Sequence, residues 1–311
     1  MNINDNIILL KGDCLIENTA IKDGSVDVIL TDLPFGFMNG FNGINWDFSI
    51  DPKAVFSIAN RILRKNGKLI LFSMEPYTSQ LITQQIPNIP FSYRAVWVKD
   101  AFANALGCNK AMVSLYEDIL IFSKDSDTCL MHPLRPYFKQ ILYYIGLNSK
   151  QINSVLKHRK AEHTFYIDST QFELCTEKTY NELSDRFNLK EMNDYIDYTE
   201  LKEIDNQFKQ EYKSTFNLWQ GGNHKSNILT YKKDYLHNHP TEKPCSLLED
   251  LIKTFSDKND LIVDLTMGSC STGIAAINTG RRFIGCEMND DYFNVSVDRV
   301  INRIKELTNE I

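Results

Sequence analysis

Residues 261–278 read LIVDLTMGSCSTGIAAIN, and this stretch decides the fold. An apolar, strand-like run ends at Asp264, and small residues fill the turn from Gly268 to Gly273. The apolar run that continues to Asn278 predicts a helix. A turn of small residues lets a ligand approach backbone N–H groups at a helix N-terminus, where an anion is favoured. The stretch therefore predicts a strand–turn–helix unit that holds a ligand.

Strand-like and helix-like segments alternate on both sides of this unit. Interleaved strands and helices imply a mostly parallel sheet with ligands at the C-terminal ends of its strands. We therefore predict the α/β class, with a doubly wound, mostly parallel, Rossmann-like sheet. The predicted strands are 7–11, 26–31, 68–72, 119–122, 261–265 and 282–287, and the predicted helices are 51–63, 246–255 and 290–307.

The middle of the chain, residues 131–223, lacks β-rich runs and has helical patterns instead. We expect a mainly helical inserted domain there, which divides the α/β domain into residues 1–130 and 224–311. A helix, the turn 146–149 and a second helix resemble a helix-turn-helix in outline. The helices predicted in the insert are 136–145, 150–158, 178–187 and 200–211.

The charge of this insert is uneven. Residues 131–163 hold six basic residues against one acid, whereas residues 164–212 hold twelve acids and five bases. The chain as a whole has a net charge of −6, which argues against a general nucleic-acid coat protein. The uneven distribution indicates a specialised module with one basic face.

The composition indicates a globular protein. Of the 311 residues, 43% are hydrophobic and 24% are charged, so the chain can bury a core. No apolar run approaches the ~18–20 residues that span a bilayer, and no signal-peptide pattern begins the sequence, so we expect a cytoplasmic protein without a membrane partner. The seven scattered cysteines are expected to be reduced thiols, and no residues show convincing metal-ligand spacing.

A second segment, Asp32-Leu33-Pro34-Phe35, follows the predicted strand 26–31. A carboxylate and a backbone carbonyl at a strand tip can accept the two N–H groups of an exocyclic amine, and Phe35 can stack on the ring that bears it. Pro34 donates no backbone N–H and biases Leu33 toward an extended conformation. Two fixed acceptors would direct the nitrogen lone pair toward an electrophile. The segment alone is also compatible with an ordinary strand-to-loop turn.

The acid that follows the Gly/Ser turn is Glu287, at the end of the next predicted strand. An acid at this position can hydrogen-bond ribose hydroxyls. The turn is neither G-x-G-x-x-G nor a Walker loop, so a dinucleotide or a nucleoside triphosphate is not favoured. A nucleoside with a carboxylate-bearing tail fits the segment better.

Together these residues resemble the β class of S-adenosylmethionine-dependent DNA amino-methyltransferases, in which the catalytic motif Asp-Pro-Pro-Tyr/Phe precedes the cofactor motif Asp-Pro-Phe-x-Gly-Ser-Gly-Thr-Thr. His239-Pro-Thr-Glu-Lys-Pro244 matches the family's His-Pro-Thr-x-Lys-Pro element, and Phe283-Ile-Gly-Cys-Glu287 matches its Phe-Ile-Gly-x-Glu segment. Gly12-Asp13-Cys14 and the segment 117–124 fit as well. The resemblance covers residues 1–130 and 218–311.

The resemblance implies S-adenosylmethionine as the cofactor and methylation of a base that is flipped out of duplex DNA. The implied catalytic residues are Asp32, Leu33 through its carbonyl, Pro34 and Phe35. The implied cofactor residues are Asp13 and Cys14 at the adenine, Glu287 at the ribose, Asp264, Gly268 and Ser269 at the methionine part, and His239, Thr241 and Lys243 closing over the methionine end. The implied DNA contacts of the basic helices are Arg135, Lys139, Lys150, Lys157, Arg159 and Lys160, which a solvated helix face would equally explain.

The chain departs from the family pattern at a few positions. Leu33 replaces the first Pro of the catalytic motif, where only a carbonyl is needed. Leu265, Thr266 and Cys270 replace Pro, Phe and Gly of the cofactor motif, and we expect Cys270 to require an unstrained backbone.

Several alternatives stay open. The family commonly has Asp in the catalytic motif for adenine N6 and Ser for cytosine N4, so Asp32 favours adenine, with cytosine N4 as the alternative. An inactive or weak DNA-binding relative and a protein-glutamine methyltransferase are further alternatives. The sequence leaves open the recognised DNA sequence, a homodimer and a restriction-endonuclease partner.

Overall fold

The computed structural model describes residues 1–36, 48–103, 109, 112–234 and 242–309. The chain forms two compact units, one of Met1–Asp125 with Ser214–Ile311 and the other of Ser126–Lys213. The insert therefore runs from 126 to 213, not from 131 to 223. Residues after 213 join the first unit because Asn217 bonds to it: its backbone N–H donates to the Thr254 carbonyl at 2.7 Å, and its side chain donates to the Ser256 carbonyl at 3.1 Å.

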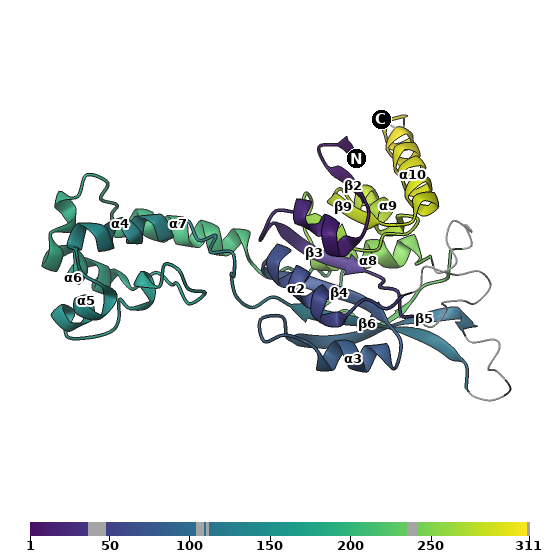
Figure 1. Ribbon diagram of the computed structural model, residues 1–311, viewed down its shortest axis with the longest axis horizontal. Coiled ribbons are helices and arrows are strands. Elements are labelled where there is room, and N and C mark those ends of the chain that lie inside the picture. The colour runs from purple at the N-terminus through teal and green to yellow at the C-terminus, as the bar shows by residue number, and fades with distance from the viewer. Residues whose placement is uncertain (37–47, 104–108, 110–111, 235–241, 310–311) are drawn as a thin grey trace. The chain divides into compact units, whose positions relative to one another are not determined.

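A nine-stranded sheet forms the centre of the first unit (Figure 1). The five strands β2-β9-β8-β3-β4 are parallel neighbours, whereas β6 is antiparallel to both β4 and β5. This arrangement confirms the predicted mostly parallel α/β sheet. In sheet order the strands are β1 (Asn2–Asn4), β2 (Ile7–Lys11), β9 (Arg282–Glu287), β8 (Leu261–Asp264), β3 (Val26–Thr31), β4 (Leu63–Ser73), β6 (Ser114–Ser123), β5 (Phe91–Ala103) and β7 (Ile228–Thr230).

Helices cover both faces of this sheet (Figure 1). Successive side chains of a strand point to opposite faces, and in β3 Val28 and Leu30 belong to one apolar core while Ile29 belongs to the other. The first core also contains α8 (Cys245–Phe255), α9 (Ser271–Asn278) and α10 (Asp290–Asn309). The second contains residues of α1 (Cys14–Glu17), α2 (Pro52–Ile62) and α3 (Tyr77–Thr83), and the short 3-10 helix η1 (Asn18–Ala20) follows α1. The fold is therefore doubly wound, as predicted.

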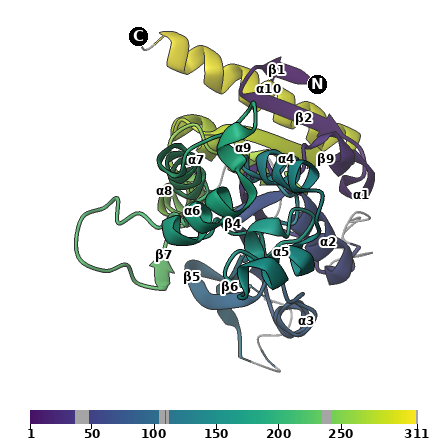
Figure 2. The same cartoon turned by 90° about the vertical axis from the view of Figure 1, so that its left-hand side faces the viewer.

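The second unit is helical and has a core of its own, which includes the buried Phe138 and Tyr180. Its described residues contain no strand, as the sequence predicts. Its helices are α4 (Arg135–Ile145), α5 (Ser149–Leu156), α6 (Glu177–Phe187) and α7 (Tyr198–Glu211), with the short 3-10 helices η3 (His163–Phe165) and η4 (Leu189–Glu191) (Figure 2).

The predicted start of α5 is confirmed by a capping box. The Asn148 side chain accepts from the Gln151 N–H, and the Gln151 side chain accepts from the Asn148 N–H. Gly146, at φ 68°, ends α4 in the left-handed conformation that favours glycine. The helix, turn and second helix outlined by the sequence are thus present.

Within the part of the chain that the structure describes, no helix is long and apolar enough to cross a membrane. The same residues contain no cluster of three or more His, Cys, Asp or Glu side chains arranged to hold a metal. The six described cysteines are free thiols.

Candidate active site

Four acids lie at the C-terminal ends of four neighbouring parallel strands. Asp13 and Asp32 follow β2 and β3, while Asp264 and Glu287 end β8 and β9. Because the sheet order is β2-β9-β8-β3, all four acids come to one edge. This is the edge where open α/β sheets bind their ligands.

The catalytic and cofactor segments contact each other directly. The Thr31 hydroxyl donates to Asp264 Oδ1 at 2.8 Å, and the Thr266 hydroxyl donates to the Asp32 carbonyl at 2.9 Å. The Thr266 N–H also donates to Asp264 Oδ1 at 3.1 Å. Thr266, a departure from the family motif, therefore connects the two segments.

Asp32 has a partner that the sequence did not predict. Lys243 Nζ donates to Asp32 Oδ2 and also lies 3.2 Å from Glu117 Oε2. Lys99 donates to Glu117 Oε1, so two lysines and two carboxylates form one network. Lys243 is 7% exposed and lies 5.1 Å from the centre of the Phe72 ring. Lys243, which the sequence predicts to close over the methionine end of the cofactor, thus contacts the Asp32 carboxylate in this structure.

The opposite charges of this network stabilise the ionised forms of Lys243 and Glu117. Burial lowers the pKa of Lys243, but the carboxylates of Asp32 and Glu117 outweigh it and raise that pKa above its usual value. Burial raises the pKa of Glu117, but Lys243 and Lys99 outweigh it and lower that pKa. Burial raises the pKa of Asp32 against the opposing charge of Lys243. Lys243 is therefore held charged although it is buried.

The rest of the catalytic segment combines a buried anchor with an aromatic ring. The Leu33 side chain is 2% exposed and belongs to the core beneath α2, which explains why an apolar residue replaces proline there. Phe35 and Pro34 are half-buried. The Phe35 ring lies 5.6 Å from the Tyr77 ring, centre to centre. The buried Tyr77 of α3 thus packs against Phe35 from the core side, and no sequence pattern pointed to it.

The turn after β8 presents its backbone to Glu287. The Gly268 N–H donates to Glu287 Oε2 at 2.9 Å, and the Asn289 N–H donates to Oε1 at 2.7 Å. Gly268 has φ 51° and Cys270 has φ 66°. The expectation of an unstrained backbone at Cys270 is therefore wrong: Cys270 adopts the left-handed conformation that favours glycine, although it carries a side chain. That conformation costs a non-glycine residue roughly 1–2 kcal/mol.

An ion pair between the half-buried Arg299 and the buried Glu242 contacts the same turn. Arg299 of α10 donates to the Ser269 carbonyl at 2.7 Å and the Ser269 hydroxyl at 2.9 Å. It also pairs with Glu242 Oε1 at 2.7 Å, which accepts from the Ser271 hydroxyl as well. Ser269 therefore contacts Arg299 in this structure. Arg299 and Glu242 were not predicted, since nothing in the sequence pairs two residues so far apart.

The acids of this edge fit a nucleoside cofactor with a cationic tail. Burial raises the pKa of Asp264 to about 6 and raises the pKa of Glu287 above its ordinary value. Buried carboxylates are stabilised by hydroxyl and ammonium donors, which ribose and an amino-acid tail supply. Asp13 caps α1 by accepting a hydrogen bond from the Leu15 N–H. Burial raises the pKa of Cys14 to about 12, so the Cys14 thiol is uncharged. His239 and Thr241 lie outside the described residues.

Two of the expected DNA-binding residues are already engaged within the second unit. Arg135 is 6% exposed and donates to the carbonyls of Tyr166, Ile167 and Ser169. We correct its expected role: Arg135 holds a loop and cannot reach a phosphate. The exposed Arg159 donates two hydrogen bonds to Glu162. The remaining four residues are exposed, namely Lys139, Lys150, Lys157 and Lys160.

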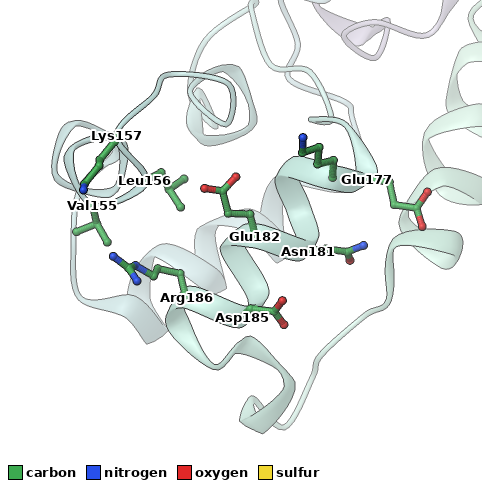
Figure 3. A pocket seen from close by; sticks show the side chains of 9 residues that line it. Val155, Leu156, Lys157, Glu177, Asn181, Glu182, Asp185 and Arg186 are labelled. Atoms are coloured by element: carbon green, nitrogen blue, oxygen red, sulfur yellow. The ribbon is translucent and has the colours of Figure 1, made fainter.

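An open pocket of about 970 Å³ lies between the end of α5 and α6 (Figure 3). Three basic and three acidic side chains line it together, so its charge is balanced and does not favour a phosphate. These side chains are Lys157, Lys178, Arg186, Glu177, Glu182 and Asp185.

The doubly wound, mostly parallel sheet, with acids at the C-terminal ends of four neighbouring strands, is the fold of the Rossmann-like methyltransferases. The N6_N4_Mtase family model, described as DNA methylase, matches residues 26–298. The chain belongs to this family of DNA methylases, whose cofactor is S-adenosylmethionine.

Relatives of known name agree with this assignment. The chain is 25% identical over 307 residues to the DNA adenine methyltransferase YhdJ of Escherichia coli K12, which covers 96% of this chain and 83% of that protein. It is 22% identical over 294 residues to the orphan methyltransferase M.BamHII of Bacillus amyloliquefaciens, covering 91% and 92%.

Two solved structures have a similar fold. The M1.HpyAVI–SAM complex has a TM-score of 0.51 at 15% identity and covers 94% of this chain and 98% of its own. The cytosine-N4-specific PvuII DNA methyltransferase has a TM-score of 0.52 at 14% identity, covering 98% and 94%. At these identities the likeness concerns the fold alone.

Proposed function

We propose that this chain methylates the exocyclic N6 amine of adenine in duplex DNA, with S-adenosylmethionine as the methyl donor. The observation that carries the proposal is the Asp32 carboxylate. Its Oδ2 accepts from Lys243, whereas its buried Oδ1 has no hydrogen-bond partner among the residues that the structure describes. A buried acceptor without a donor is costly, so Oδ1 is suited to an incoming N–H group.

The segment around Asp32 would hold the base. Asp32 and the Leu33 carbonyl accept the two N–H groups of the amine, and Phe35 stacks on the base beside Tyr77. Pro34 keeps the turn extended. Such a base must leave the duplex, since its amine is unreachable within the stack. Bound S-adenosylmethionine supplies an electrophilic methyl group, so that an N–C bond forms as the S–C bond breaks and the nitrogen then loses its proton.

The acids of the other strand tips would hold the cofactor. Glu287 accepts from the ribose hydroxyls, Asp264 faces the cationic tail, and Gly268 and Ser269 form the adjoining turn. Asp13 and Cys14 lie at the expected adenine side. The residues 126–213 would form the target-recognition domain, with Lys139, Lys150, Lys157 and Lys160 as its phosphate contacts.

Adenine is favoured over cytosine because the amine-gripping residue is an aspartate, and YhdJ, a relative that spans nearly the whole chain, is named an adenine methyltransferase. Cytosine N4 is the second candidate, since the PvuII enzyme of the same fold acts on it. A weak or inactive DNA-binding relative is the third.

Product identification separates the three. The purified chain is incubated with genomic DNA and methyl-labelled S-adenosylmethionine, and the DNA is then digested to nucleosides. We expect label in N6-methyl-2′-deoxyadenosine, and about 100-fold less in the Asp32→Ala variant. Label in N4-methyl-2′-deoxycytidine would support the second candidate. Cofactor binding without any labelled nucleoside would support the third.

A further inference from the structure

The residues of the network around Asp32 come from four neighbouring strands of the sheet, or directly follow one of them. Asp32 follows β3, Phe72 lies in β4, Glu117 in β6 and Lys99 in β5, and these strands are adjacent in the order β3-β4-β6-β5. Glu117 is the cross-strand partner of Trp97, and Trp97 and Phe72 belong to the same apolar core. The network is therefore built into one face of the sheet.

The two oxygens of each carboxylate in this network have different neighbours. Glu117 Oε1 accepts from Lys99, and Glu117 Oε2 lies 3.2 Å from Lys243. Asp32 Oδ2 accepts from Lys243, while Asp32 Oδ1 is buried without a partner in the described part of the chain. The chain Lys99–Glu117–Lys243–Asp32 thus ends in an oxygen that can still accept a hydrogen bond.

We propose that Lys243 is a positioning residue of the amine site. It holds Oδ2 of Asp32 so that Oδ1 is turned toward the target amine, and Glu117 and Lys99 hold Lys243 in place. This inference rests on the proposed function, because the amine it serves is the target of that reaction. It assigns to Lys243, Glu117 and Lys99 a task at the base, not at the cofactor.

Two consequences follow from the charges alone. A buried carboxylate is costly unless a cation accompanies it, so Lys243 also keeps Asp32 ionised and therefore able to accept. Glu117 acts in the opposite direction, because its negative charge repels that of Asp32. The charged groups that face Asp32 are Lys243, Glu117, Lys99 and, from the cofactor side, Asp264.

The test replaces single members of the network by side chains of similar shape. Lys243→Met removes the cation next to Asp32 and should raise the Asp32 pKa, so that the acid limb of the kcat profile moves up by at least one pH unit. Glu117→Gln removes the repelling charge and should move the limb toward lower pH. Lys99→Met should move it up by a smaller amount. A general loss of packing would not move the acid limb in opposite directions in the Lys243 and Glu117 variants.

Two measurements are compared. One is kcat for DNA methylation at saturating DNA and cofactor between pH 5 and pH 9. The other is a ¹³C NMR titration of the Asp32 carboxyl carbon in the free protein, with Asp32→Asn to assign the signal. The titration needs no turnover, so it measures the coupling of Asp32 to Lys243 and Glu117 even if the chain proves inactive. If Lys243→Met fails to fold, the same titration is done on Glu117→Gln and Lys99→Met, whose shifts in the Asp32 pKa are expected to have opposite signs.

Lys225→Met is the matched control. Lys225 is a half-buried lysine that pairs with Asp250 at 2.6 Å in the same unit, and its loss should leave the pH profile unchanged. Opposite shifts in the Lys243 and Glu117 variants support the inference. Profiles that superimpose on that of the unmodified chain would overturn it, while loss of methylation in the unmodified chain would count against the proposed function alone.

Discussion

The Thr266 hydroxyl donates a hydrogen bond to the backbone carbonyl of Asp32 at 2.9 Å. This bond connects the segment proposed to hold the target amine with the segment proposed to hold the cofactor, although the two bonded residues are 234 positions apart in the sequence. The relatives' motif has phenylalanine here, so this chain uses a polar contact where its family uses an apolar wall. Thr266 and Thr31 together thereby fix the spacing of Asp32 and Asp264.

Thr266→Val keeps the shape and removes the hydroxyl. We expect the free energy of unfolding to fall by about 1 kcal/mol. We also expect kcat to fall more than the cofactor affinity, because the missing bond positions the Asp32 segment. Urea denaturation and steady-state kinetics measure both. Thr279→Val, whose hydroxyl only bonds carbonyls of its own helix, is the control. Equal losses of kcat in the two variants would contradict a specific role for Thr266.

The Asp264 pKa of about 6 predicts how stability and cofactor affinity depend on pH. Its ordinary value is 3.8, so the folded chain binds the proton more tightly than the unfolded chain. Its contribution to stability is therefore present below pH 4 and is lost as the pH rises through 6. A cationic cofactor tail favours the ionised form, so the affinity for S-adenosylmethionine should rise over the same interval.

Isothermal titration calorimetry from pH 5 to pH 8 measures this rise in affinity, and Asp264→Asn should flatten it. Urea denaturation of the free protein over pH 4–7 should show the opposite trend for the contribution of Asp264 to stability. An affinity that does not change between pH 5 and pH 7 would contradict the assignment of Asp264 to the cofactor.

Cys270→Gly and Cys270→Ala separate backbone strain from packing. Both variants lose the buried thiol, but only glycine adopts φ 66° without strain. We expect the glycine variant to be more stable than the alanine variant by about 1 kcal/mol. Denaturation midpoints of the two variants test this directly. A more stable alanine variant would mean that the turn relaxes out of the left-handed conformation.

Arg299→Met should weaken both the fold and the cofactor turn. It leaves Glu242 buried without its cation, which costs about 3 kcal/mol in comparable pairs, and frees Ser269. The affinity for S-adenosylmethionine should fall as well. The double variant Arg299→Met with Glu242→Gln removes the unpaired charge and should recover part of the stability. Additive losses in the double variant would argue against direct coupling.

The exposed lysines of the second unit give a prediction for DNA. Replacing Lys150, Lys157 and Lys160 by Gln should weaken binding and reduce the slope of log K against log salt by roughly 1 for each phosphate that is no longer neutralised. Arg159→Gln is the control, because Glu162 already pairs with Arg159. Fluorescence anisotropy over a salt series measures the slopes. An unchanged slope in the triple variant would refute the phosphate contacts.

Sequence patterns located the strands that are buried on both faces. β2, β3 and β9 have the predicted bounds, because each is a short, mostly apolar run with an acid at its C-terminal end or within two residues after it. β5 was not predicted, since its apolar residues alternate with Arg94, Lys99 and Asp100. That alternation is itself a strand pattern: Ala95 and Trp97 are buried at every second position.

The site was harder to predict than the fold. Its acids follow strand ends and could be identified, but the partner of each charged side chain depends on packing between distant elements. The family motif assigns Lys243 to the cofactor, although its side chain contacts Asp32. The basic stretch assigns Arg135 to DNA, although its side chain bonds to three carbonyls. A motif identifies a charged residue, but it does not say which way the side chain points.

The strand order has a consequence for how this protein is made. β2 and β3 are synthesised early, but the sheet places β9 and β8 between them, and these are the last strands to leave the ribosome. The unit of residues 126–213 has its own core and can be complete before them. The edge that carries Asp32 and Asp264 thus forms only after β8 has been synthesised, and a product truncated before β8 would contain the helical unit without that edge.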